Sequence, residues 1–169
     1  MAATIGVFVY TGVTASTEST VQTGISFLSI DSSATDVTTR QNNPVVAGTV
    51  SFEKHIRLKA TVAPAVSWGA VKFWTDGAGS ANVGLRAKLS VGTGGATPGT
   101  GDLAPVSTAM TGDTDAYAAT AGAKAVWDAA TYAAINTVSK ALVLQLSPTG
   151  AAAPGAWTQE VLNYSYDEV

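Results

Sequence analysis

Residues 51–62 (SFEKHIRLKATV) alternate between apolar and polar side chains. Phe52, Ile56, Leu58 and Ala60 share one parity, and the residues between them are polar or charged. Because successive side chains of a β-strand point to opposite faces, this pattern predicts a strand with one dry face and one solvated, charged face. The same alternation returns at residues 83–91, which predicts an antiparallel sheet with one wet face.

The rest of the chain predicts short strands separated by turn-forming residues. Strands are expected at residues 4–10, 25–30, 45–62 with a bend at Gly48, 66–75, 83–91, 140–147 and 157–167. Residues 31–44 and 92–105 are rich in Asp, Asn, Ser, Gly and Pro, and we expect loops there. The composition of residues 121–135 (AGAKAVWDAATYAAI) predicts a short helix, with a loop and an edge strand as the alternative.

This order of elements predicts an all-β fold. Seven to eight strands with turn-rich connections indicate a two-sheet antiparallel sandwich, jelly-roll or immunoglobulin-like, with at most one short helix. Two layers hide one face of each sheet, which a single antiparallel sheet cannot do. With 169 residues and no internal repeat, we expect a single domain, residues 1–169.

The composition favours small, uncharged side chains. Charged residues make up 12% of the chain, about half the usual share of a soluble domain. A surface with few Lys and Glu loses little side-chain entropy when a partner buries it, so the composition suits a subunit of an assembly. A codon bias toward Ala and Gly would produce the same composition.

Several classes of function are disfavoured. The net charge of −3 argues against nucleic-acid binding. The chain has no cysteine, which excludes disulfides and Cys-ligated metal centres. No apolar run approaches 18 residues and no secretory leader is expected, so we predict no membrane span. We expect no cofactor and no metal.

Basic residues concentrate in the middle of the chain. Of the nine Lys and Arg residues, six lie between Lys54 and Lys88. The side chains predicted on the outward face are His55, Arg57, Lys59, Arg86 and Lys88. They form either an ordinary solvated face or a positive stripe that docks on an acidic protein surface.

The tryptophans are a second candidate surface. In the strand expected at residues 66–75, Trp68, Lys72 and Trp74 share one parity, and Val71 and Phe73 share the other. We expect Trp68 and Trp74 to lie in the core or at a subunit interface. The alternative is a sugar-stacking platform, which would need Trp68, Trp74, Trp127 or Trp157 exposed in a row.

No motif encodes a reaction, so we expect a protein that is not an enzyme. His55 is interpreted as a surface histidine, because nothing like G-x-S-x-G accompanies it. Asp113 and Asp115 resemble a fragment of a calcium loop without its other ligands, and Asx-turns explain them better. The glycines of residues 92–101 carry no Lys and precede no helix, so they predict a loop.

Two parts of the chain together resemble a known group of proteins. These are residues 43–62 with VKFWTDG at 71–77, and TQEVLNYSYDE at 158–168. They are similar to small β-sandwich structural proteins of tailed-bacteriophage virions, which decorate capsids or sit at the neck and tail. The resemblance implies a virion component without enzymatic activity that self-associates and docks on a shell or tube.

The hypothesis that follows is a capsid decoration protein located in the virion. It would form a homotrimer or other homo-oligomer, with the major capsid protein or other virion subunits as partners. Its basic face would meet an acidic lattice, and attachment would weaken steeply as salt rises. The alternatives are a neck, tail or baseplate protein of the same virion, and a carbohydrate-binding or adhesin module.

Overall fold

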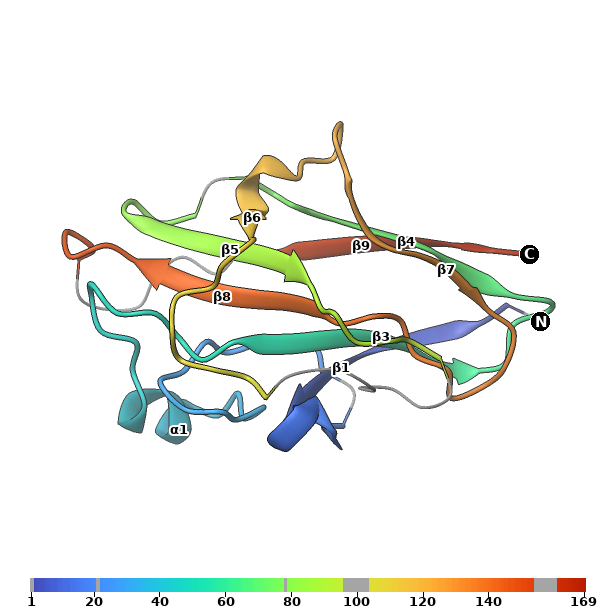
Figure 1. The fold of residues 1–169 in the computed structure, drawn as a ribbon, viewed down its shortest axis with the longest axis horizontal. Coiled ribbons are helices and arrows are strands. Elements are labelled where there is room, and N and C mark those ends of the chain that lie inside the picture. Colours follow the sequence, from blue (N-terminus) through green and yellow to red (C-terminus); the bar gives the residue numbers. More distant parts are fainter. Residues whose placement is uncertain (1, 21, 78, 96–103, 154–160) are drawn as a thin grey trace.

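The computed structural model describes residues 2–20, 22–77, 79–95, 104–153 and 161–169, and these form two antiparallel sheets (Figure 1). In spatial order, the larger sheet contains β2 (Thr17–Glu18), β1 (Thr4–Thr11), β3 (Lys54–Val62), β8 (Leu142–Pro148), β5 (Val83–Leu89) and β6 (Thr114–Asp115). The smaller sheet contains β7 (Ala125–Tyr132), β4 (Trp68–Thr75) and β9 (Leu162–Glu168). The predicted all-β sandwich is therefore confirmed.

The main hydrophobic core lies between the two sheets. The larger sheet contributes apolar residues of one parity from β3, β5 and β8, and the smaller sheet contributes aromatic residues from β4 and β7. The buried residues of this core include Ile56, Leu58, Ala87, Leu142, Leu144, Trp68, Val71 and Trp127. The dry face predicted for residues 51–62 is this core face.

Loops cover the opposite face of the larger sheet over β3 and β8, which corrects the wet face predicted for residues 51–62, while Arg86 and Lys88 of β5 stay partly exposed. The amide of Glu53 donates to the Val106 carbonyl at 2.9 Å, and the side-chain amide of Gln145 donates to the Thr108 carbonyl at 2.8 Å. Further along β3, Arg57 Nη1 donates to the Thr93 carbonyl at 2.9 Å. Figure 1 shows the yellow segment before β6 running across the strands. The polar parity of β3 therefore lies under a second layer of main chain.

Two of the predicted elements are wrong. Residues 25–30 are not a strand, because their main chain bonds to loops: Leu28 O accepts from the Phe52 amide at 2.9 Å. Residues 121–135 do not form the predicted helix, and the alternative of a loop and an edge strand is the one observed, because Ala125–Tyr132 is β7, an edge strand paired along β4. A six-residue helix, α1 (Val37–Asn42), instead lies in the predicted loop 31–44, where the Asp36 side chain caps it through the Thr39 amide at 2.8 Å.

The other predicted strands agree with the structure apart from their ends. The strand expected at 45–62 begins only at Lys54, because residues 45–53 form turns and single bonds to neighbouring loops. Residues 154–160, the start of the strand expected at 157–167, and residues 96–103 of the loop expected at 92–105 lie outside the described residues.

Candidate functional site

The tryptophans predicted for an interface lie in different environments. Trp68 is fully buried, and its Nε1 donates to Thr137 Oγ1 at 3.2 Å. Trp74 is half-buried, and the Lys124 ammonium group lies 4.2 Å from the centre of one of its rings. Trp127 is buried as well, and Trp157 lies outside the described residues. Among the tryptophans that the structure describes, Trp68 and Trp127 are buried, so these do not form the exposed row that a sugar platform requires.

The predicted positive stripe is covered or paired with acids. Arg57 is fully buried, so its predicted place on a solvated face is wrong. Each of the other three cations has a carboxylate partner: the pairs are Lys59–Glu18, Arg86–Asp113 and Lys88–Glu53. The Arg86 guanidinium also holds the pKa of the Asp113 carboxyl below its usual value by donating a hydrogen bond to it. Little net positive charge is left for an acidic partner.

Arg57 acts as a clamp inside the molecule. Its Nη1 donates to the Thr93 carbonyl at 2.9 Å and to the Ser139 carbonyl at 2.8 Å, and its guanidinium lies 5.4 Å from the centre of the Tyr10 ring. Burial lowers the pKa of Arg57 from its usual value, and the charges of surrounding groups only partly oppose that shift. These bonds fix two loops to β3, which is a structural role.

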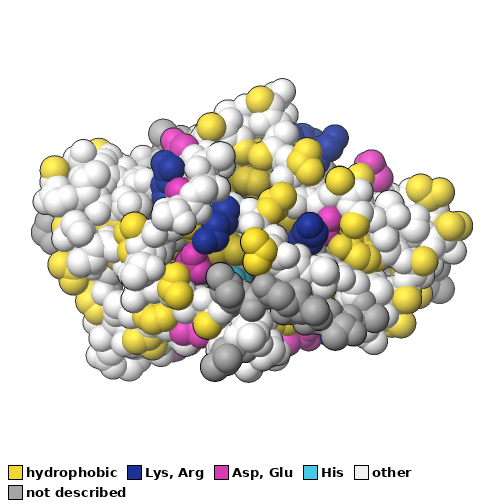
Figure 2. All heavy atoms as spheres, in the orientation of Figure 1, with side chains coloured by type: hydrophobic (Ala, Val, Ile, Leu, Met, Phe, Trp, Pro, Cys, Tyr) yellow, Lys and Arg dark blue, Asp and Glu magenta, His cyan; other side chains and the backbone are white. Residues whose placement is uncertain are grey.

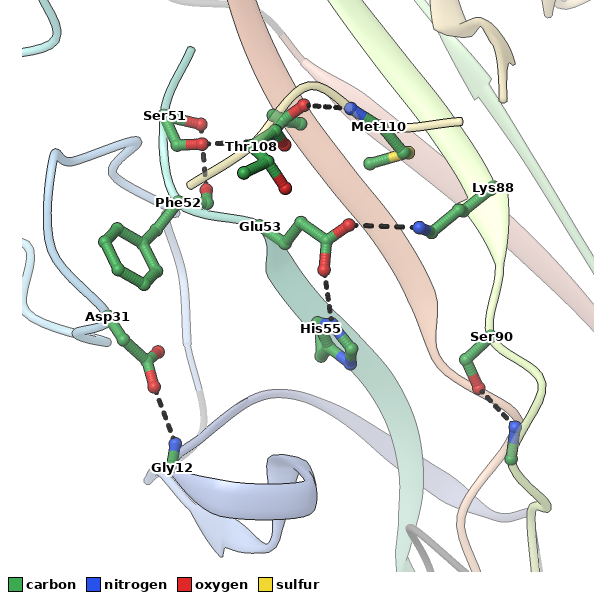
Figure 3. A network of polar contacts seen from close by, with 12 residues as sticks. Gly12, Asp31, Ser51, Phe52, Glu53, His55, Lys88, Ser90, Thr108 and Met110 are labelled. Atoms are coloured by element: carbon green, nitrogen blue, oxygen red, sulfur yellow. Dashed lines mark hydrogen bonds and ion pairs between the residues drawn. The ribbon is translucent and has the colours of Figure 1, made fainter. Parts of the chain in front are cut away.

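Glu53, His55 and Lys88 form a buried polar group on the covered face (Figure 3). Glu53 Oε1 accepts from Lys88 Nζ at 3.0 Å, and Glu53 Oε2 lies 3.3 Å from His55 Nε2. Burial alone would raise the pKa of Glu53, but the hydrogen bonds from His55 and Lys88 outweigh it and leave the pKa below its usual value. His55 Nδ1 is buried without a hydrogen-bond partner. The prediction of a surface histidine is therefore wrong.

An open groove of about 700 Å³ runs beside this group. Glu53, His55 and Lys88 belong to its lining, together with apolar residues from β5, β7, β8 and the loop before β6. Four large apolar side chains of the lining are exposed: Leu89 by 42%, Val91 by 79%, Val106 by 40% and Val126 by 56%. Figure 2 shows hydrophobic side chains (yellow) around basic ones (dark blue) on this face, with the single histidine in cyan. The groove is the candidate site.

The groove offers one imidazole, that of His55, with the Glu53 carboxylate beside it. The Ser90 hydroxyl, which belongs to the lining, accepts a hydrogen bond from the Gly92 amide at 3.2 Å (Figure 3). Within the described ranges, no three His, Asp or Glu side chains gather to hold a metal ion. No helix in that part of the chain is long and apolar enough to cross a membrane.

Sequence reasoning found Lys88 but missed the groove around it. Leu89 and Val91 alternate in step with the core residues of β5 and so look like core residues in the sequence. Nothing in their local pattern shows that the neighbouring strand β6 pairs only as far as Ala87. Val106 and Val126 lie in segments expected to be a loop and a helix. The one available signal was Glu53 two residues before His55, because a carboxylate and an imidazole of the same strand parity can pair.

Comparisons of the chain with protein-family models, with curated proteins and with solved structures find no match.

Proposed function

We propose that this chain is a structural protein of a tailed-bacteriophage virion, without enzymatic activity, and that it decorates the capsid. The observation that carries the proposal is the groove, which presents exposed apolar side chains beside an internally neutralised polar group. Exposed apolar surface of this kind is typical of protein interaction sites. The chain also resembles virion β-sandwich proteins at residues 43–62, 71–77 and 158–168. This resemblance suggests the virion as the assembly in which such a site would bind a neighbour.

The composition and the tryptophans support the same proposal. Small side chains pack closely across symmetric contacts, which suits a homotrimer or another homo-oligomer that docks on the major capsid protein. A carbohydrate-binding module is less well supported, because Trp68 and Trp127 are buried and cannot stack on a sugar. A neck, tail or baseplate protein of the same virion would use the same kind of surface.

Location and copy number on purified particles test the proposal. We expect hundreds of copies per particle by quantitative mass spectrometry, with density on the capsid shell by electron cryomicroscopy. Six, twelve or a few dozen copies at one vertex would instead indicate a neck or tail protein. Absence of the chain from every particle would contradict a virion role.

A further inference from the structure

The strand β5 has an open edge where the groove lies. Its other edge pairs with β8 from Val83 to Leu89, and the ladder continues where the Ser90 amide donates to the Ala141 carbonyl at 3.0 Å. On the groove side, β6 pairs only with Arg86 and Ala87. Beyond Ala87, β5 has no neighbouring strand on that side among the described residues.

The main-chain groups of this edge point into the groove. In an antiparallel ladder alternate residues direct their N–H and C=O groups to opposite sides. Ser90 bonds toward β8, whereas the Ala87 carbonyl accepts from Thr114 Oγ1 on the β6 side at 3.3 Å. Leu89 and Val91 share the parity of Ala87, so their N–H and C=O groups face the open side. No described residue forms a hydrogen bond with them.

The walls of the groove suit an extended polypeptide. Val106 rises from the loop on one face and Val126 from β7 on the other, with the β5 edge between them. The edge from Lys88 to Val91 is about 13 Å long, which matches about four residues of a strand. An extended segment of this length would present its own main chain to β5 and alternate side chains to the two walls.

The polar groups of the groove indicate that a bound polypeptide would be recognised through its main chain. Lys88 is paired with Glu53 and Arg86 with Asp113, so in the described part of the chain neither cation is left unpaired to select a charged ligand. Rows of main-chain donors and acceptors between apolar walls are what an added β-strand satisfies. His55 Nδ1, a buried polar atom without a partner in the lining, is a second sign that the groove is incomplete.

We propose that the open edge of β5 takes up an extended, alternately apolar segment of a neighbouring polypeptide chain, which adds a strand in line with β6. The proposal rests on the proposed function, because the neighbour is another subunit of the assembly. The main chain of the added strand would form hydrogen bonds with Leu89 and Val91. Its alternate side chains would contact the exposed Val106 and Val126.

Site-specific cross-linking in assembled particles tests the contact directly. The photo-reactive residue p-benzoylphenylalanine replaces Val91 in one variant and Val46, which is 61% exposed outside the groove, in the control. After irradiation, mass spectrometry maps the attachment site. We expect the Val91 position to cross-link to one short contiguous segment of a neighbouring subunit, and the Val46 position not to reach that segment. No cross-link at Val91, or the same cross-links from both positions, would overturn the proposal.

Removal of one outward N–H group tests the hydrogen bonding. Leu89→Pro deletes an amide that bonds to no described residue, and proline is tolerated at a free edge. We expect incorporation into particles to fall by at least about tenfold relative to Leu89→Ala, which keeps the amide. Leu89→Asp, which places a charge at the edge, should reduce incorporation in the same way and serves if the proline variant fails to fold.

The outcomes separate this proposal from the proposed function. Particles that contain wild-type chain, show no Val91 cross-link and incorporate Leu89→Pro and Leu89→Asp normally would overturn the added strand but leave the virion role intact. A wild-type chain that is absent from every particle would overturn both.

Discussion

Lys54 is a buried cation at the start of β3. Its side chain is 1% exposed, its Nζ donates to the Ser32 carbonyl, and the Asp31 carboxylate is the nearby charge that favours its protonated form. Burial outweighs that charge and lowers the pKa of Lys54 from 10.5 to about 8. The side chain holds the loop of residues 29–32 against the sheet at the cost of a buried ammonium group.

The free energy of unfolding is expected to rise with pH above about 8. Between the folded pKa of about 8 and the unfolded value of 10.5, the unfolded chain binds one proton more than the folded chain. Stability therefore increases in that window, by at most about 1.4 kcal/mol per pH unit. At higher pH the opposite trend sets in, because burial raises the pKa of Tyr10 and Tyr132 and the unfolded chain loses those protons first.

Urea unfolding at several pH values from neutral to 9.5 measures this dependence. Lys54→Met should abolish the rise, and Lys72→Met, which removes an exposed lysine, should retain it. An equal rise in both variants would contradict the assignment to Lys54.

Arg57 is expected to contribute strongly to stability. Arg57→Met would leave the Thr93 and Ser139 carbonyls without their guanidinium donor, and each such hydrogen bond from a charged group contributes roughly 1.5–3 kcal/mol. Methionine also removes the desolvation cost of the buried guanidinium, so we expect a net loss of about 2–4 kcal/mol in the free energy of unfolding, measured by urea denaturation. The exposed Arg40→Met is the control and should change it by less than about 0.5 kcal/mol. A similarly small effect at Arg57 would show that the clamp is dispensable.

At the scale of elements, β4 shows how one irregularity changes which side chains are buried. Its ladders shift register between Gly69 and Val71, and Ala70 has a φ of 49°, in the left-handed region. The extra residue places Trp68 on the same side as Val71 and Phe73, although strict alternation puts them on opposite faces. Trp68, Val71 and Phe73 therefore all reach the core, and Lys72 stays exposed.

Gly69 is required where β4 and β7 approach each other. A Cβ at this position would lie 2.2 Å from the Ala130 carbonyl oxygen and 2.8 Å from Thr131 Cα, both main-chain atoms that cannot move alone. Gly69→Ala should reduce the free energy of unfolding by at least about 2 kcal/mol. Gly84→Ala in β5 is the matched control, since its Cβ would lie 3.5 Å from the Ser147 oxygen, an ordinary contact, and should be neutral or slightly stabilising. Equal melting temperatures for both variants would refute the close approach.

Elements were predictable where one pattern dominated locally. Residues 4–10 and 140–147 are strongly apolar β-formers and are strands in the structure. Residues 121–135 misled the prediction because alanine favours a helix, while pairing to β4 decided for a strand. Residues 25–30 are apolar because Ile25 and Phe27 pack on the core, although no strand lies beside them in register.

At the scale of the whole molecule, the placement of charges alters the expected salt dependence. The sequence suggested attachment through a positive stripe, but Arg57 is buried and Lys59, Arg86 and Lys88 each face a carboxylate. We therefore expect attachment through the groove to change by less than about threefold between roughly 50 and 300 mM salt, in co-sedimentation with particles lacking the protein. A steep loss of binding over this range would favour the charged face.

The sequence by itself determined the all-β class, most of the strands and the core face of β3, because alternation of side chains is a local property of an extended chain. Only the tertiary structure decided what covers the other face, since loops of residues 90–95 and 104–110 cover Arg57 and His55 through contacts far apart in sequence. It also decided where pairing stops: β6 ends after two residues, and that leaves the β5 edge open. The number of residues over which two strands pair depends on the paths of the loops that connect them. No local pattern of side chains specifies those paths.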